Sequence, residues 1–151
     1  MAVYEIVKNG DSILREKAKT VAAVNQSIIK LLNNMKDTMY ASKGVGLAAP
    51  QIGVSKRVIV VDAEDELIEL INPEIIDGEG AETDLEGCLS VPGLIGEVTR
   101  FERVRVKGLN RRGEETELTR EGMTARALQH EIDHLDGILF IDKAENVKPV
   151  G

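Results

Sequence analysis

The chain of 151 residues, 42% hydrophobic and 30% charged, has the size and composition of a soluble globular protein, so we expect residues 1–151 to form a single domain. It contains neither an apolar run of the about 20 residues that span a membrane nor the pattern of a signal peptide, which predicts a cytoplasmic protein without membrane contact. The net charge of −7 argues against nucleic-acid binding, which depends on lysine and arginine contacts to phosphates, and we expect no direct sequence-specific contact with nucleic acid.

The first elements of the chain are expected to be helical. Asp11 and Ser12 can cap a short helix over residues 13–18. Between residues 26 and 40 apolar side chains recur at spacings of three and four, which predicts a longer helix with one face on the core. Residues 42–51 contain two glycines, a proline and several small residues. Such a segment is typical of a loop whose backbone is approached closely by another group.

A first pair of strands is predicted next. Residues 57–61 and 67–71 are rich in β-branched and aliphatic side chains and flank an acidic turn, which indicates an antiparallel hairpin. Asn72-Pro73 breaks this pattern. A passage rich in glycine and glutamate then leads into a strand-like segment that carries Cys88 and stops at residues 91–93, with the sequence Val-Pro-Gly.

A second hairpin is expected from the alternation of apolar and polar residues over 104–107, the turn at 110–113 and the strand at 115–119. Basic residues gather around it but alternate with acidic ones, so we interpret them as a solvated surface of the hairpin rather than a phosphate-binding strip. These residues are Arg100, Arg103, Arg105, Lys107, Arg111 and Arg112.

The last long helix is expected over residues 123–135, and Gly137 is a natural stop after it. Residues 139–141 return as a short strand. Because strands occur in adjacent groups with tight turns and without βαβ alternation, we predict an α+β fold with antiparallel sheets packed around this C-terminal helix. One side of the helix would be anchored in the core by Ala125, Leu128, Ile132 and Leu135.

Both histidines of the chain lie on this helix, in the sequence His130-Glu131-Ile132-Asp133-His134. Positions i and i+4 are only about 40° apart around a helix, so the two imidazoles can bind one metal ion. Glu131 lies beside the same point and can take a proton from a metal-bound water. The small Ala127, one turn earlier, leaves room for a substrate side chain.

Two histidines do not complete a catalytic metal site, which needs three protein ligands and one open position. The pattern also arises by chance on charged helices, so a third ligand is needed to support it. Cys88 is the only cysteine. A lone cysteine is usually a small buried apolar residue, but the glycine beside it and the lack of another soft ligand favour a metal ligand. A single cysteine cannot form an internal disulfide, which agrees with a reducing compartment.

Three segments, Gly44–Gln51, Glu86–Ser90 and His130–His134, resemble the motifs of peptide deformylase in their order and separations. The resemblance also includes residues 13–15 and extends to about residue 142. It implies a metal-dependent hydrolase that removes the formyl group from the N-terminal methionine of newly made proteins. Some members of this family continue into a long C-terminal helix, whereas this chain stops at Gly151, so a ribosome-docking role of such a helix is not transferred.

The resemblance also implies roles for individual residues. The ion, with a water in the fourth position, would be held by Cys88, His130 and His134. Glu131 would take the proton of the water, and the oxyanion would receive hydrogen bonds from the side-chain amide of Gln51 and the backbone N–H of Leu89. The backbone of the substrate would pair, like a strand, with Val45, Gly46 and Gly87.

The ligand set suits Zn²⁺, Fe²⁺, Ni²⁺ and Co²⁺ alike, so the ligands do not select the metal; the resemblance points to Fe²⁺ in the cell. The implied partners are N-formyl-methionyl nascent peptides, with transient association with the ribosome, and the expected state is a monomer.

One alternative function is that of a metallopeptidase that cuts internal peptide bonds, although a cysteine upstream of the helix is unlike the usual third metal ligand of such enzymes. Another is a structural metal-binding module, although such sites usually have four protein ligands.

Overall fold

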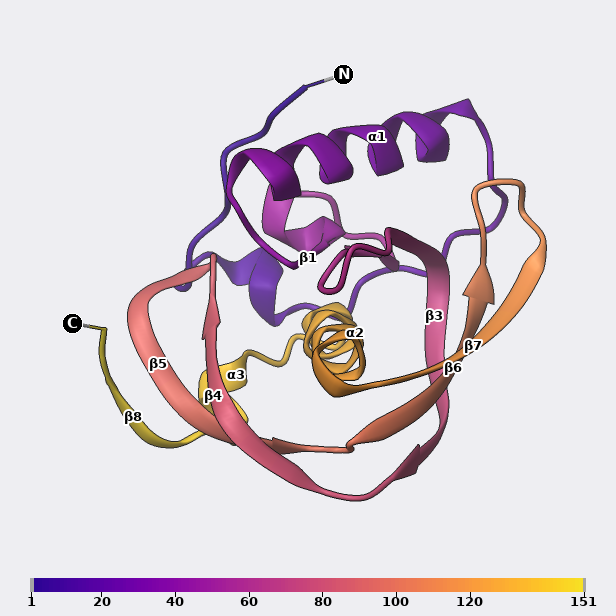
Figure 1. The fold of residues 1–151 in the computed structure, drawn as a ribbon. Helices are drawn as coiled ribbons and strands as arrows, with labels where there is room; N and C mark the ends of the chain where they lie inside the picture. Colours follow the sequence, from indigo (N-terminus) through magenta and orange to yellow (C-terminus); the bar gives the residue numbers. More distant parts are fainter. Residues whose placement is uncertain (1, 151) are drawn as a thin grey trace.

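The computed structural model describes residues 2–150, and in it two antiparallel sheets surround one helix. The five-stranded sheet has the order β1-β2-β3-β6-β7, and the three-stranded sheet has the order β4-β5-β8. Helix α2 (Gly122–Leu135) lies between the sheets and is seen end-on in Figure 1. The predicted α+β fold with antiparallel sheets around the C-terminal histidine helix is therefore confirmed.

Helical segments and antiparallel strands make up most of the remaining described chain. The helices are a 3₁₀ turn at Ser12–Arg15, α1 (Gln26–Ala41), a second 3₁₀ turn at Ala49–Ile52 and α3 (Phe140–Lys143). The strands are β1 (Gly46–Ala48), β2 (Val58–Val61), β3 (Ile68–Glu79), β4 (Glu82–Cys88), β5 (Val91–Arg100), β6 (Arg103–Leu109), β7 (Glu115–Glu121) and β8 (Glu145–Pro149).

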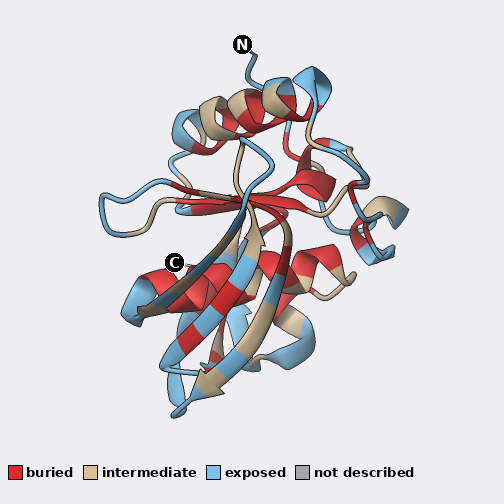
Figure 2. Ribbon diagram, turned by 90° about the vertical axis from the view of Figure 1, so that its right-hand side faces the viewer, coloured by how far each residue is buried: buried red, intermediate tan, exposed pale blue. Residues whose placement is uncertain are grey.

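Strand β2 belongs to the core and is buried on both faces; Figure 2 shows buried strands, in red, between the helices. Because successive side chains of a strand point to opposite faces, Val58 and Val60 pack towards α1, whereas Ile59 and Val61 pack towards α2. Each such side chain contributes about 1.5–3 kcal/mol when fully buried. The predicted core-facing helix at 26–40 and the hairpin of residues 57–61 and 67–71 are confirmed, and the core holds the histidine helix against this sheet.

The N-terminal helix and the predicted loop at 42–51 differ from expectation. Asp11 does cap a helical turn, since its side chain accepts a hydrogen bond from Ile13 N at 3.2 Å, but the turn ends at Arg15. Ala18 is instead extended alongside α2, and its N–H donates to the carbonyl of Leu135 at 2.8 Å. The loop contains strand β1, which pairs with β2. Its three residues are all buried, so they show none of the alternation that marks a half-buried strand.

Contrary to the prediction, Asn72-Pro73 does not end the strand; β3 continues through it to Glu79. Asn72 adopts a positive φ of 53°, and the pairing register with β6 shifts between Ile71 and Glu74. Pro73 lies within this irregularity, where a missing N–H breaks no regular ladder bond. The side chain of Asn72 hydrogen bonds to Val21 N at 2.8 Å and to Val21 O at 2.9 Å, which stabilises the bulge.

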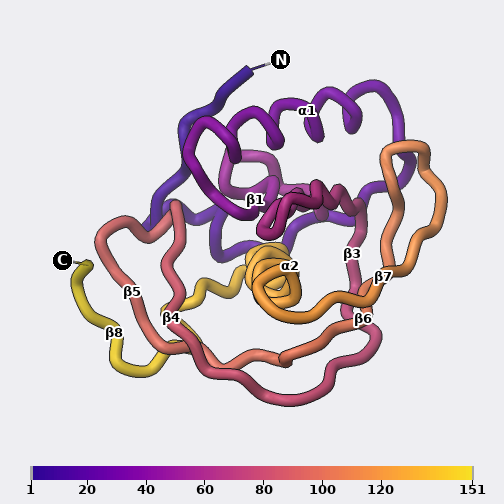
Figure 3. Tube along the Cα trace, in the orientation of Figure 1, coloured from indigo at the N-terminus to yellow at the C-terminus, as the bar shows by residue number. Residues whose placement is uncertain are grey.

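Two predictions near the C-terminal sheet are also wrong. Residues 91–93 do not close the strand of Cys88; they begin β5, and Val91 pairs back with Cys88 across a tight turn. Residues 139–141 are not a strand, because Phe140 begins the short helix α3 and is buried against β5. A short apolar run has the same appearance in a helix and in a strand. The actual last strand, β8, runs beside β5 (Figure 3).

The second predicted hairpin is confirmed as β6 and β7, and the predicted stop of the last helix is confirmed at Gly137. This glycine has a φ of +75°, and a Cβ there would lie 2.5 Å from the carbonyl oxygen of Arg15. Within residues 2–150, no helix is long and apolar enough to cross a membrane.

Candidate active site

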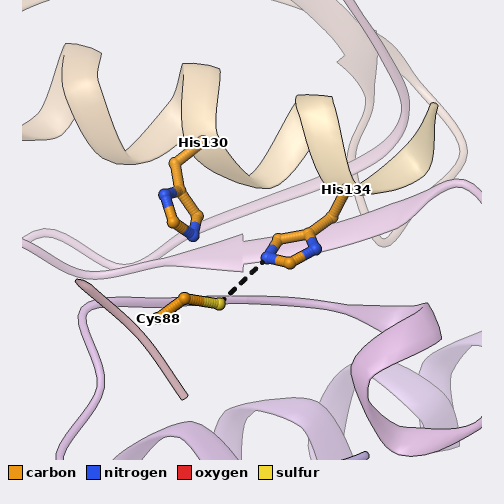
Figure 4. A group of neighbouring side chains, drawn as sticks. All are labelled: Cys88, His130 and His134. Carbon is orange, nitrogen blue, oxygen red and sulfur yellow. Dashed lines mark hydrogen bonds between the residues drawn. The ribbon is translucent and has the colours of Figure 1, made fainter. Parts of the chain in front are cut away.

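The three predicted metal ligands meet at one point between β4 and α2. Cys88 ends β4, and His130 and His134 lie one turn apart on α2 (Figure 4). Their ligand atoms all lie within 4.8 Å of one another, and Cys88 Sγ is 3.3 Å from His134 Nε2. A tetrahedral ion with bonds of about 2.0–2.3 Å separates its ligand atoms by about 3.3–3.8 Å. The separation of Cys88 and His134 already matches this spacing, and the three ligand atoms lie close enough together to hold a metal ion by one thiolate and two imidazoles.

The two imidazoles have different surroundings. Nδ1 of His130 hydrogen bonds to Glu86 Oε1 at 2.9 Å, which leaves Nε2 for the metal. Burial lowers the pKa of His130, but the charges of Glu131 and Cys88 outweigh it and raise the pKa to about 10. Burial and the charge of His130 lower the pKa of His134 well below its ordinary value. The negative charges that favour a proton on His130 also favour a divalent cation at the same place.

Glu86 is the carboxylate that orients His130, and it is itself held by two arginines. Arg100 donates from Nε to Glu86 Oε2 at 2.5 Å and from Nη2 to Oε1 at 2.9 Å. Arg126 donates from Nη1 to Oε2 at 2.6 Å. Burial raises the pKa of Glu86, but the hydrogen bonds from His130 and Arg100 outweigh it and hold the pKa at about 2. Glu86 is therefore an anionic acceptor for the imidazole N–H.

Glu131 is buried beside the triad, with 4% of its surface exposed. Among the side chains of residues 2–150, its Oε1 is one of the few buried polar atoms without a hydrogen-bond partner. Burial raises the pKa of Glu131 to about 7, against the charges of His130 and Arg100. A carboxylate with a pKa near neutrality and a free oxygen can take up and release a proton.

Gln51 is fixed in a single orientation next to Cys88. Its Oε1 accepts a hydrogen bond from Ala48 N at 2.9 Å, so its NH₂ group faces the site. This group lies 3.1 Å from Ser90 Oγ and 3.7 Å from Cys88 Sγ. The amide can therefore present an N–H to an oxygen atom near the triad.

A cavity of about 480 Å³ opens over the triad. Leu89 lies in the turn after Cys88, and its side chain would contact a Cβ at Gly44 at 2.9 Å. A Cβ at Gly46 would lie 2.6 Å from Glu131 Oε2. All the predicted site residues except His134 line the cavity: Val45, Gly46, Gln51, Gly87, Cys88, Leu89, Ala127, His130 and Glu131.

The family model for polypeptide deformylase matches residues 3–150 of this chain. The chain belongs to the peptide deformylase family. Members of this family are hydrolases that use a single metal ion to remove the formyl group from N-formyl-methionyl peptides. The resemblance of the three motifs to peptide deformylase is thereby confirmed.

Known deformylases resemble the chain along almost its whole length. The peptide deformylase of Pelotomaculum thermopropionicum is 64% identical over 148 residues, which cover 98% of this chain and 96% of the relative. That of Carboxydothermus hydrogenoformans is 65% identical over 147 residues, 97% of each chain. The crystal structure of the Thermotoga maritima enzyme superposes with a TM-score of 0.92 at 44% identity, covering 95% of this chain and 98% of that one.

Three residues of this deformylase site were not singled out by sequence reasoning. Glu86 lies inside a motif but received no role, although it is two residues before Cys88 and so points to the same face of the strand. Arg126 lies four residues before His130, a spacing that places both on one helix face. Arg100 was assigned to a solvated basic surface, which is wrong: only 5% of it is exposed, and it bridges Glu86 and Asp133. Its three neighbours on β6 do form exposed ion pairs: Arg103 with Glu79, Arg105 with Glu117, and Lys107 with Glu74.

Proposed function

We propose that this chain hydrolyses the formyl amide of N-formyl-methionyl peptides, releasing formate and a free N-terminal amine, and that residues 1–151 act as one catalytic domain. The observation that carries the proposal is a buried carboxylate, Glu131, with an unpartnered oxygen beside a Cys-His-His cluster at the floor of a cavity. A structural metal module has no use for such a carboxylate.

Cys88, His130 and His134 hold the ion in this proposal. When bound, the ion polarises the formyl oxygen and makes a water acidic enough to attack near neutral pH. We propose Fe²⁺ as the ion in the cell, and Zn²⁺, Ni²⁺ or Co²⁺ as ions that purified protein can carry. The ligand set accepts all four, and the choice of Fe²⁺ rests on the family.

Glu131 takes the proton of the attacking water at its carboxylate and then gives it to the leaving amine. Burial raises the pKa of its carboxyl group, and a general base works best when its pKa lies near the working pH. Gln51 donates its side-chain N–H, and Leu89 its backbone N–H, to the oxygen that becomes negatively charged in the transition state. The bond from Ala48 N to Gln51 Oε1 supports this role, because it keeps the amide from turning round.

The substrate lies in the cavity as an extended chain. Among the described strands, β1 pairs only with β2, and β4 only with β5, so each presents a free edge to which a peptide can add as a strand. We assign this pairing to Val45 and Gly46 on one side and Gly87 on the other. Ala127 leaves space for the methionine side chain, since its methyl group faces the same cavity.

We further propose that the protein acts in the cytoplasm as a monomer and meets its substrates through transient association with the ribosome. The substrate supports this proposal, because formylated N-termini occur on chains that are being synthesised.

The function is tested by incubating the metal-loaded protein with formyl-Met-Ala-Ser and with the unformylated peptide. We expect formate from the first only. Cleavage of an internal peptide bond in either would instead favour the metallopeptidase, and metal binding without any hydrolysis would favour the structural module.

A further inference from the structure

Arg126 is a buried arginine of α2 for which the proposed chemistry has no use. Only 5% of it is exposed, and its guanidinium donates to three acceptors. These are Glu86 Oε2 at 2.6 Å, the carbonyl oxygen of Val98 at 2.9 Å and the carbonyl oxygen of Glu82 at 2.7 Å. One side chain of the histidine helix thus holds both strands of the β4-β5 hairpin.

Glu86 connects this contact to the metal ligands. Its Oε2 accepts from Arg126 and its Oε1 accepts from His130 Nδ1. The two donors are one turn apart on α2, so a single carboxylate ties two successive turns of the helix to β4. Glu86 also lies two residues before Cys88 on that strand. Arg126 is therefore connected to His130 through the carboxylate of Glu86, and to Cys88 through the backbone of β4 between Glu86 and Cys88.

The position of Cys88 relative to the histidines depends on such contacts. The thiol belongs to β4 and the imidazoles to α2, and these elements are far apart in sequence. Strand β4 lies at the edge of its sheet and, within residues 2–150, pairs with β5 only, and residues 82–85 of β4 are exposed. Backbone pairing thus fixes β4 to β5 but not to α2. The link to α2 is made by polar side chains, and Arg126 makes the largest number of hydrogen bonds across it.

We propose that Arg126 is a positioning residue that sets the separation between the Cys88 thiolate and the two imidazoles, and thereby the affinity of the site for its metal. It acts through Glu86 and through the carbonyl groups of the hairpin, and it does not touch the reacting atoms. The inference rests on the proposed function only in that Cys88, His130 and His134 are taken as metal ligands. Loss of a group that orients a ligand lowers metal affinity by about 10–100-fold.

Arg126→Met tests the role, because methionine keeps most of the apolar stem that faces the cavity and removes all the donors. Metal affinity is measured by competition with a chelator, using Zn²⁺ and Co²⁺, and the Co²⁺ form is followed by its thiolate-to-metal absorption band. We expect a loss of affinity of about 10-fold or more and a shifted or weakened band. Arg120→Met is the matched control, since Arg120 of β7 makes an exposed ion pair with Glu66 and contacts none of the metal ligands, and it should bind both ions as the parent does.

A double-variant comparison tests the route through Glu86. In the Glu86→Gln background, Arg126→Met should lower the affinity by less than about threefold, because the bridge to His130 is already weakened. An equal loss in both backgrounds would refute the route through Glu86. If Arg126→Met does not fold, Arg126→Lys serves instead. Lysine carries all its donors on one nitrogen, whereas Nη1 and Nη2 of Arg126 reach different acceptors, so lysine cannot keep the whole set of contacts and we expect a loss of at least about threefold.

Unchanged metal affinity and an unchanged Co²⁺ spectrum in the folded variant would overturn the proposal, even if activity fell, since Arg126 would then only shape the cavity. These measurements need no substrate. A parent protein that binds metal tightly but releases no formate would contradict the proposed function and leave the role of Arg126 to be decided by affinity.

Discussion

Gly46 lies where β1 passes Glu131, the proposed general base, and Gly46→Ala should displace its carboxylate. An added Cβ would lie 2.6 Å from Glu131 Oε2, 2.9 Å from its Cγ and 3.0 Å from its Cδ. The strand is held by its pairing of Gly46 with Val61 and is fully buried, so the side chain must move instead of the backbone. Ordinary contact begins at 3.4 Å, so the oxygen has to shift by about 0.8 Å, the difference between 3.4 and 2.6.

A shift of about 1 Å in a catalytic group costs about 100-fold in rate, or about 2.7 kcal/mol. We therefore expect kcat for formyl-Met-Ala-Ser to fall by about 100-fold while metal affinity stays unchanged, because no ligand atom contacts Gly46 in this way. Formate release and chelator competition measure the two quantities. In Gly44→Ala the one close contact of the Cβ is with the end of the flexible Leu89 side chain, at 2.9 Å, and Gly46 O lies at an ordinary 3.5 Å, so the loss should be less than about tenfold.

Two results would contradict this reasoning. A metal-loaded Gly46→Ala protein with kcat within about threefold of the parent would mean that Glu131 need not stay where it is. The second result would be additive effects of the two substitutions. In a Glu131→Gln background we expect Gly46→Ala to have almost no further effect on kcat. If Gly46→Ala reduced the residual rate by the same factor as in the parent, the methyl group would act on the substrate and not on the base.

Three further predictions follow from the site and its support. Glu131→Gln should retain fold and metal but lose kcat by several orders of magnitude, as expected for a general base; normal formate release by this variant would refute the mechanism. Gly137→Ala should lower the free energy of unfolding by about 2 kcal/mol or more, and Tm by about 4–8 °C, because its φ is +75° and its Cβ would lie 2.5 Å from Arg15 O; an unchanged thermal melt would show that this turn relaxes freely. Protein loaded with Fe²⁺ under argon should lose activity in air through oxidation of the iron or of Cys88, whereas nickel- or zinc-loaded protein should be stable; an air-stable iron form of undiminished activity would contradict this expectation.

The Cys-His-His cluster could be predicted from the sequence because the chemistry of its members is local. Two histidines four residues apart on an amphipathic helix share a face in any fold that keeps the helix. Cys88 had no other soft ligand to compete with it as the third ligand. The helices at 26–41 and 122–135 were likewise predictable, because each shows an uninterrupted 3.6-residue period.

The support of the site could not be predicted because it depends on tertiary contacts. Arg100 alternates with acidic residues along the chain like a surface residue, and only the position of β5 behind α2 brings it to Glu86 and Asp133. Asn72 reads as a strand breaker, but its side chain satisfies both backbone groups of Val21, and the strand continues. In both cases the hydrogen-bond partners lie far away in the sequence, so the residues next to Arg100 and Asn72 do not predict the contact.

The residues that hold the metal ligands in place are charged for a physical reason. A metal site assembled from a strand and a helix needs fixed directions as well as fixed distances, and apolar packing supplies no directional bonds. Glu86 receives four hydrogen bonds, from Arg100, Arg126 and His130, which fix its orientation and offset the cost of burying its charge. Apolar replacements of similar size could leave the stability of the fold intact, but they would leave His130 without an acceptor for Nδ1–H. The buried arginines are therefore explained by the orientation that they give to Glu86 and His130, and not by the stability of the fold.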